Sequence, residues 1–161
     1  MNNDVLKKLE SDFGLWTEDP EKIQLENPVL MGMFNGGLPK RSVVQIAAQS
    51  GAGKSTLAIQ ITRECLNQGL KVAYIDTEGG LNTNMLQTMK VYDKVYSSKN
   101  PNGTFYIFTK SDCGEVNDLL NTIGENDLAD VVILDSLGAL DSGIYDLGGT
   151  NANTPKVRSR Y

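Results

Sequence analysis

The ten residues AAQSGAGKST at 47–56 constrain the fold of this chain more than any other part of its sequence. An apolar, β-branched run, Ser42–Ala48, overlaps the start of this stretch and predicts a buried strand. Apolar residues at helical spacing follow the loop, and Gly69 is placed to end that helix. Gly51 and Gly53 can adopt positive φ, which lets the loop backbone approach a ligand closely. The sequence therefore predicts a strand, a flexible loop and a helix N-terminus, in that order.

This order of elements predicts a binding site for the phosphates of a nucleoside triphosphate. Inward-pointing backbone N–H groups and a helix N-terminus form a nest for an anion. The pattern G-x-x-x-x-G-K-[ST] adds a lysine for the β- and γ-phosphates and a hydroxyl for Mg²⁺. Ala48 replaces the first glycine here, and the alternative to a phosphate site is an ordinary Gly/Ser turn with a solvated lysine. The residues expected at the nucleotide are Ser50, Gly51, Ala52, Gly53, Lys54, Ser55 and Thr56, with Ser55 also a metal ligand.

Composition excludes several other kinds of site. The sequence has no histidine, which excludes histidine catalysis and histidine-ligated zinc. Its two cysteines, Cys65 and Cys113, are far apart, and we interpret them as free thiols in a reducing cytoplasm. No long apolar run or signal pattern is present, so we expect a cytoplasmic protein with no membrane segment. The net charge of −5 argues against a broad nucleic-acid surface, although Lys156, Arg158 and Arg160 form a local basic cluster.

The rest of the chain predicts an α/β fold with a mainly parallel sheet flanked by helices. Further strands are expected over Lys71–Gly80, Thr104–Lys110 and Asp130–Leu140, with helical patterns between them. Ligands of such sheets bind at the carboxyl ends of the strands. An amphipathic helix is expected over Asp4–Gly14, followed by a linker. We therefore divide the chain into an N-terminal helix and linker, residues 1–20, and a core from 21 to 161.

Acidic residues end three of these strands. Asp135 follows four apolar residues and is expected to hold Mg²⁺ through its shell, opposite Ser55. The alternative is an aspartate that caps its strand in a turn with Ser136. Glu78 lies just beyond its strand, where it can polarise an attacking water; the alternative is a solvated loop carboxylate. A third acidic segment, Asp112–Glu115, has no chemistry that its residues alone predict.

This combination of motifs resembles the RecA family of homologous-recombination ATPases, phage UvsX-like members included. The resemblance covers nearly the whole chain. It rests on the segments NGGLPKRSVVQIAAQSGAGKSTLAIQI, VAYIDTEGGLN, SDCGEVNDLL and VVILDSLGAL. Many NTPases share the phosphate loop, whereas its ordered combination with YIDTEGG and SDCGE is more specific. The resemblance implies that Lys54, Ser55 and Thr56 bind ATP and Mg²⁺. It further implies that Glu78 activates water and that Asp135 completes the Mg²⁺ shell.

Some positions depart from the family pattern. The acidic and aromatic residues that the family places near adenine correspond to Asn82 and Met85 here. The segment LKKLESDFG sits where bacterial RecA proteins carry a helix that packs on the neighbouring protomer.

RecA-like proteins continue past the Mg²⁺-site strand with DNA-binding loops and further strands. The resemblance therefore implies a partial core, with no strand between Ser42–Ala48 and Asp130–Asp135. A second polypeptide, a longer parent chain or direct pairing of these two strands would each resolve that gap.

The function implied by the resemblance is ATP-Mg binding and hydrolysis in a RecA/UvsX-like DNA recombinase of a bacterial or phage-infected cell. Such a protein forms a homo-oligomeric helical filament on single-stranded DNA and promotes strand exchange in recombination and repair. DNA would be contacted mostly by parts beyond these residues, and either a second polypeptide or a longer parent chain would complete the core. The alternatives are a RecA-fold ATPase of KaiC, RadA or hexameric-helicase type and a non-catalytic nucleotide-binding scaffold. The SDCGE segment favours the recombinase.

Overall fold

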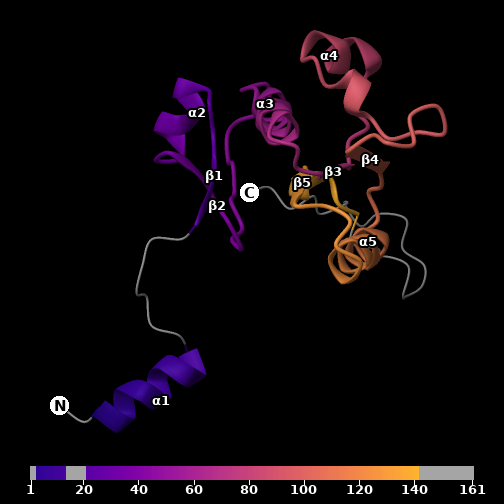
Figure 1. Cartoon of the computed structure of the whole chain (residues 1–161). Helices are drawn as coiled ribbons and strands as arrows, with labels where there is room; N and C mark the ends of the chain where they lie inside the picture. Colours follow the sequence, from indigo (N-terminus) through magenta and orange to yellow (C-terminus); the bar gives the residue numbers. More distant parts are fainter. Residues whose placement is uncertain (1–2, 14–20, 142–161) are drawn as a thin grey trace, which may run out of the picture.

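The structure, a computed structural model, describes residues 3–13 and 21–141 of the chain (Figure 1). Helix α1, Asn3–Phe13, matches the helix expected over Asp4–Gly14 with a shift of one residue. The expected linker at 14–20 and the basic cluster near the end of the sequence lie outside the described residues.

A three-stranded parallel sheet forms the centre of the described fold. Its strands are β3, Val72–Asp76, β4, Phe105–Thr109, and β5, Val131–Asp135, in the spatial order β4-β3-β5. All five residues of the central strand β3 are buried. The register pairs Asp76 with Asp135, so the carboxyl ends of β3 and β5 are level with each other. The prediction of a parallel α/β sheet is confirmed, although each strand ends earlier than the sequence predicted.

Two long helices lie on opposite sides of this sheet (Figure 1). Helix α3, Lys54–Asn67, begins directly after the glycine-rich loop and ends before Gly69, whose φ of 80° confirms it as the stop. Its buried face includes Ile59 and Cys65, which are fully enclosed in the core. Helix α5, Cys113–Glu125, covers the other side. The short helix α4, Thr83–Thr88, follows β3, and 3₁₀ turns occupy Tyr92–Lys94 and Leu137–Ala139.

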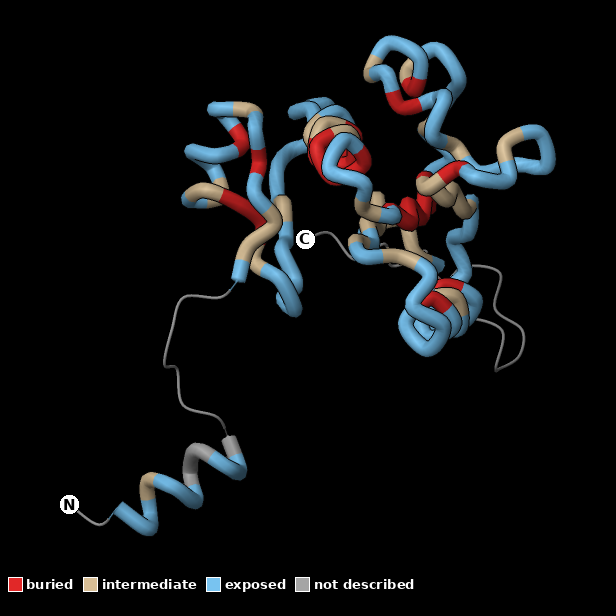
Figure 2. Tube along the Cα trace, in the orientation of Figure 1, coloured by how far each residue is buried: buried red, intermediate tan, exposed pale blue. Residues whose placement is uncertain are grey.

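A small antiparallel unit is joined to the sheet through α3. It consists of β1, Lys22–Gln24, α2, Pro28–Met33, and β2, Gly37–Pro39. Asn27 caps α2 by accepting hydrogen bonds from its first N–H groups, and proline at the first helical position is favourable there. Figure 2 shows buried segments in this unit as well as in α3 and the sheet. Leu25, Leu30 and Leu38 of the unit share one hydrophobic core with α3 and β3.

The prediction of a buried strand over Ser42–Ala48 is wrong. The structure has no strand at 43–49, and Val43 is 98% exposed. Apolar, β-branched residues favour a strand, but a strand also needs a neighbour for its backbone hydrogen bonds. Strand β5 pairs only with β3 and does not pair with 43–49, so the alternative of direct pairing is not what the described residues adopt. Among the described residues, β5 is therefore an edge strand of the sheet.

Candidate active site

Two glycines of the loop before α3 have positive φ angles. Gly51 and Gly53 have φ angles of 78° and 92°, which confirms the expectation of positive φ at both. Gly53 immediately precedes α3, and no side chain caps the first N–H groups of that helix. These N–H groups and the positive end of the helix dipole are therefore free to meet an anion.

Most of the residues that the sequence assigned to the nucleotide gather around one pocket at this helix N-terminus. Glu78 and Asp135 reach it from the ends of β3 and β5. Ala52 does not line the pocket, and its backbone N–H donates to the carbonyl oxygen of Gln49 within the loop. The loop and helix residues that line the pocket are Ser50, Gly51, Gly53, Lys54, Ser55 and Thr56.

Lys54 extends back across the loop. Its Nζ donates to the carbonyl oxygens of Ala48 and Gln49, at 3.3 Å and 3.2 Å. Both contacts are to neutral acceptors, which bind an ammonium less strongly than a phosphate oxygen does. The lysine is therefore held beside the loop without an anionic partner among the described residues.

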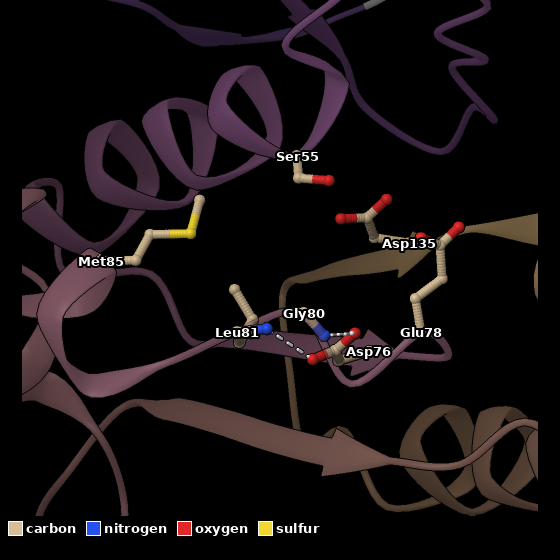
Figure 3. A pocket seen from close by; sticks show the side chains of 7 residues that line it. All are labelled: Ser55, Asp76, Glu78, Gly80, Leu81, Met85 and Asp135. Atoms are coloured by element: carbon tan, nitrogen blue, oxygen red, sulfur yellow. Dashed lines mark hydrogen bonds between the residues drawn. The ribbon is translucent and has the colours of Figure 1, made fainter. Parts of the chain in front are cut away.

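A second pocket adjoins the first and contains the expected metal ligands (Figure 3). Ser55, Glu78 and Asp135 line both pockets. Figure 3 shows the Ser55 hydroxyl and the Asp135 carboxylate facing the same space from α3 and β5. A hydroxyl and a carboxylate are hard oxygen donors that suit Mg²⁺, which usually takes one or two protein ligands beside phosphates and water. The described residues contain no group of three or more histidine, cysteine, aspartate or glutamate side chains that could hold a metal ion.

Asp135 is held from below by a buried tyrosine that the sequence reasoning missed. The hydroxyl of Tyr74, in β3, donates to Oδ2 of Asp135 at 2.6 Å. Burial, and then the hydrogen bond to Asp135, raises the pKa of Tyr74. The phenol therefore stays protonated and remains a donor. The only sequence signal was a polar-tipped residue two positions before the acidic end of an otherwise apolar strand.

Glu78 is fixed by the turn that follows β5. Oγ of Ser136 donates to Oε1 of Glu78 at 2.7 Å. Thr77, next to Glu78, holds the backbone of Ser136 from both sides. Its Oγ1 accepts from the Ser136 N–H at 2.7 Å and donates to the Ser136 carbonyl at 2.8 Å. Glu78 therefore has a defined position in the structure, with its second carboxylate oxygen available.

Asp76 shapes the loop that carries Glu78. This aspartate is 4% exposed, and its two oxygens accept hydrogen bonds from the N–H groups of Gly80 and Leu81, at 3.1 Å and 2.9 Å. Figure 3 shows both bonds at the floor of the pocket. A buried carboxylate with two backbone donors has its charge compensated locally. Both oxygens of Asp76 are thus used in hydrogen bonds to the loop backbone, and Asp135 is the carboxylate that faces Ser55.

The remaining predicted residues lie farther from this centre. Met85 lines the second pocket, whereas Asn82 caps α4, with its Oδ1 accepting from the Met85 N–H at 3.0 Å. In the third acidic segment, Asp112 caps α5 by accepting from the Glu115 N–H at 2.9 Å. Glu115 pairs with Lys110 at 2.9 Å on the surface. The segment for which the sequence offered no chemistry is therefore a helix start in this structure.

Comparisons with known proteins extend over most of the chain. A family model described as "AAA domain" matches residues 10–154. The DNA repair and recombination protein RadB of Methanobrevibacter smithii is 32% identical over 128 residues, covering 76% of this chain and 53% of that protein. Protein RecA of Sulfurimonas denitrificans is 33% identical over 107 residues, covering 65% and 28%. Protein RecA of Delftia acidovorans is 29% identical over 168 residues, covering 97% and 43%. The chain thus spans about half the length of these curated relatives, or less.

Among the described residues, no helix has both the length and the apolar character that crossing a bilayer requires.

Proposed function

This chain belongs to the AAA domain family and corresponds to the N-terminal portion of a RecA-like recombination ATPase, and from that premise we propose that it binds and hydrolyses ATP with Mg²⁺. The observation that carries the proposal is the meeting of three segments. Ser55 at the start of α3, Glu78 beyond β3 and Asp135 at the end of β5 line the same two adjoining pockets.

The residues of the loop bind the triphosphate in this proposal. Backbone N–H groups around Gly51 and Gly53 surround the phosphates, and the Lys54 ammonium exchanges its carbonyl acceptors for oxygens of the β- and γ-phosphates. Ser55 and Asp135, which line both pockets, would hold Mg²⁺. When bound, the ion neutralises charge on the phosphates during transfer to water.

Glu78 acts as the general base. Ser136 occupies Oε1 of Glu78, so Oε2 is the oxygen that accepts a proton from the attacking water. The adenine lies farther out, near Met85 and Asn82. A methionine thioether packs well against a purine ring, and Met85 already lines the second pocket beside Leu81.

Glu78→Gln tests this assignment. The amide keeps the shape of the side chain and still accepts from Ser136, but it cannot take a proton. Calorimetric ATP affinity is expected to stay within about threefold of wild type, while turnover falls by roughly 10²–10⁴, the usual contribution of a general base. Glu115→Gln, in the α5 cap region, is the matched control. The reference is an assembly in which the wild type turns over, and turnover of Glu78→Gln within about twofold of that reference overturns the role.

We further propose that the activity serves DNA recombination and repair in the cytoplasm of a bacterial or phage-infected cell. The proposal includes a homo-oligomeric helical filament on single-stranded DNA, completion of the core by a second polypeptide or a longer parent chain, and DNA contacts mostly from parts beyond these residues. The printed names of the RadB and RecA relatives support the recombination class.

Electron microscopy of the natural protein with single-stranded DNA and a non-hydrolysable ATP analogue tests the assembly. Helical filaments are expected, and they should require both DNA and nucleotide. Closed rings would instead support a motor of KaiC, RadA or hexameric-helicase type. The absence of any nucleotide-dependent assembly would support a binding scaffold.

A further inference from the structure

We propose that Tyr74 is a positioning residue for the metal site, because its hydroxyl holds the carboxylate of Asp135 in the orientation that faces Ser55. The inference rests on the proposed ATP-Mg function and names a residue that the phosphate-loop and strand-end motifs do not contain. Tyr74 lies beneath the pocket rather than on its lining, so it acts on the metal only through Asp135.

The register of the sheet brings the two side chains together. Tyr74 pairs with Ile133, and Asp76 pairs with Asp135, on parallel neighbouring strands. Side chains two residues apart on a strand share one face, so Tyr74 lies one diagonal step from Asp135 on the same face. At this separation the long phenol spans the step, and its oxygen reaches Oδ2 of Asp135 at 2.6 Å.

The phenol is fixed by its surroundings. Tyr74 has no exposed surface, and its ring meets Phe105 edge to face, with ring centres 6.3 Å apart and planes at 77°. A buried hydroxyl that loses its acceptor leaves an unsatisfied polar group in the core, so the packed phenol and the carboxylate each favour the position of the other. Since the ring cannot move without disturbing the core, the carboxylate is the partner that becomes fixed.

A fixed carboxylate matters for a metal that keeps most of its ligands as water and phosphate. Oδ2 of Asp135 accepts from Tyr74, which leaves Oδ1 to face the space shared with Ser55. Hydrogen-bond partners behind a metal ligand orient it in advance, and their removal typically reduces metal affinity by roughly 10–100-fold. The hydrogen bond from the phenol also withdraws some negative charge from the carboxylate, which lowers Mg²⁺ affinity slightly. We expect the gain in affinity from fixing the orientation of the carboxylate to be larger.

Tyr74→Phe is the test, because the phenylalanine ring keeps the contact with Phe105 and removes only the hydroxyl. A fluorescent ATP analogue is titrated onto the natural protein, first in EDTA and then with increasing Mg²⁺. The Mg²⁺ concentration for half-maximal enhancement of binding is expected to rise about tenfold, with unchanged affinity in EDTA. Tyr106→Phe in β4, whose ring packs against Tyr96 instead, is the matched control and is expected to leave both values unchanged. An unshifted or lowered Mg²⁺ requirement in Tyr74→Phe overturns the inference.

A double-mutant cycle separates positioning from a general effect on the fold. In an Asp135→Ala background, Tyr74→Phe is expected to produce no further change in Mg²⁺ dependence, because the carboxylate through which it acts is absent. A full, additive tenfold shift in that background overturns the inference. If wild-type protein shows no Mg²⁺-dependent nucleotide binding at all, the proposed function fails; if it does and only the Tyr74 shift is missing, this inference alone fails.

A spectroscopic measurement covers the case in which Tyr74→Phe does not fold. Tyrosine bands in the Raman spectrum respond to whether the phenol donates a strong hydrogen bond. The difference spectrum between wild type and Asp135→Ala, which has no side-chain acceptor, is expected to show loss of one strong donor. Identical tyrosine bands in the two proteins would show that Asp135 is not the acceptor in solution and would overturn the inference.

Discussion

We expect nucleotide affinity to depend more on Lys54 than on any other single residue. Its ammonium touches only two neutral carbonyl oxygens, so the charge of a triphosphate would be met chiefly by this side chain and the helix N-terminus. Lys54→Ala is expected to weaken ATP binding at least tenfold, or about 1.4 kcal/mol, by calorimetry. Lys94→Ala, on an exposed 3₁₀ turn away from both pockets, serves as the control. Equal ATP affinities for the two variants would contradict the assignment of the phosphate site to the loop.

The two cysteines provide a pH-dependent prediction. Burial, and then the negative charges of Glu64 and Asp130, raises the pKa of Cys65 from 9.0 to about 11. Between these values the thiol stays neutral in the folded state and ionises in the unfolded chain. The unfolded state therefore binds fewer protons, and the free energy of unfolding falls as pH rises from about 9, by up to about 1.4 kcal/mol per pH unit.

Urea denaturation between pH 8 and 10 measures this slope. Cys65→Ala is expected to flatten it, even though the smaller side chain also lowers stability at every pH. Cys113→Ala, at an exposed thiol, is expected to leave the slope as in wild type. If Cys65→Ala keeps the wild-type slope, its thiol does not titrate differently on unfolding.

At this scale the sequence predicted the residues but not their partners. Ser55 and Asp135 line the same pockets, and the sequence predicts this because Ser55 belongs to the glycine-rich loop and Asp135 ends an apolar strand. The bonds from Tyr74 to Asp135 and from Ser136 to Glu78 depend on how β3 and β5 are aligned. Neither strand contains that alignment in its own residues, because it results from the packing of the whole sheet.

The elements themselves were predicted best where local pattern and burial agree. Helix α3 combines apolar spacing, a glycine-rich start and Gly69 as a stop, and all three are features of the sequence. Strands were predicted too long, since the apolar run Asp130–Leu140 continues past the last residue paired with β3. The strand prediction at 43–49 was wrong for a different reason. These residues favour a strand, but the strand forms only when a neighbouring strand supplies its backbone hydrogen bonds.

Glu64 connects two elements and offers a prediction on stability. This residue of α3 is 5% exposed, and its Oε2 accepts from the N–H groups of Glu26 and Asn27, at 2.6 Å and 3.2 Å. Glu64→Ala leaves these two N–H groups without their acceptor and is expected to lower the free energy of unfolding by about 2–3 kcal/mol. Urea denaturation measures it, with the exposed Glu125→Ala in α5 as control. A loss below about 0.5 kcal/mol would mean that water replaces the carboxylate.

At the scale of the whole molecule, the open side of β5 stands out. Among the residues that the structure describes, β5 pairs with β3 alone; Val132 in β5 is 39% exposed, and Val43 in the unpaired segment 43–49 is 98% exposed. Unpaired strand edges of this kind recruit a further strand. We expect hydrogen exchange at 43–49 to be fast in the 161-residue chain and to slow strongly, together with β5, once a second polypeptide or a longer parent chain supplies that strand.

Mass spectrometry resolves this exchange segment by segment. The α3 amides provide the internal control, since they are already hydrogen-bonded within the helix. A monomeric, cooperatively folding 161-residue chain with protected amides at 43–49 would contradict the expectation. It would also show that these residues find a partner within the chain.

The two edges of strand β5 therefore differ in their hydrogen bonding. On one side the strand is bonded to β3, and its last residue carries the carboxylate that we propose as a metal ligand; on the other side no strand of the described residues pairs with it. Any strand that docks on the open side would steady the same backbone that carries Asp135 and the serine bonded to Glu78. Thermodynamic linkage makes such an effect reciprocal: a docked strand that tightens the hold on nucleotide is itself held more tightly by nucleotide. Nucleotide binding and docking of the added strand would then each raise the affinity of the other.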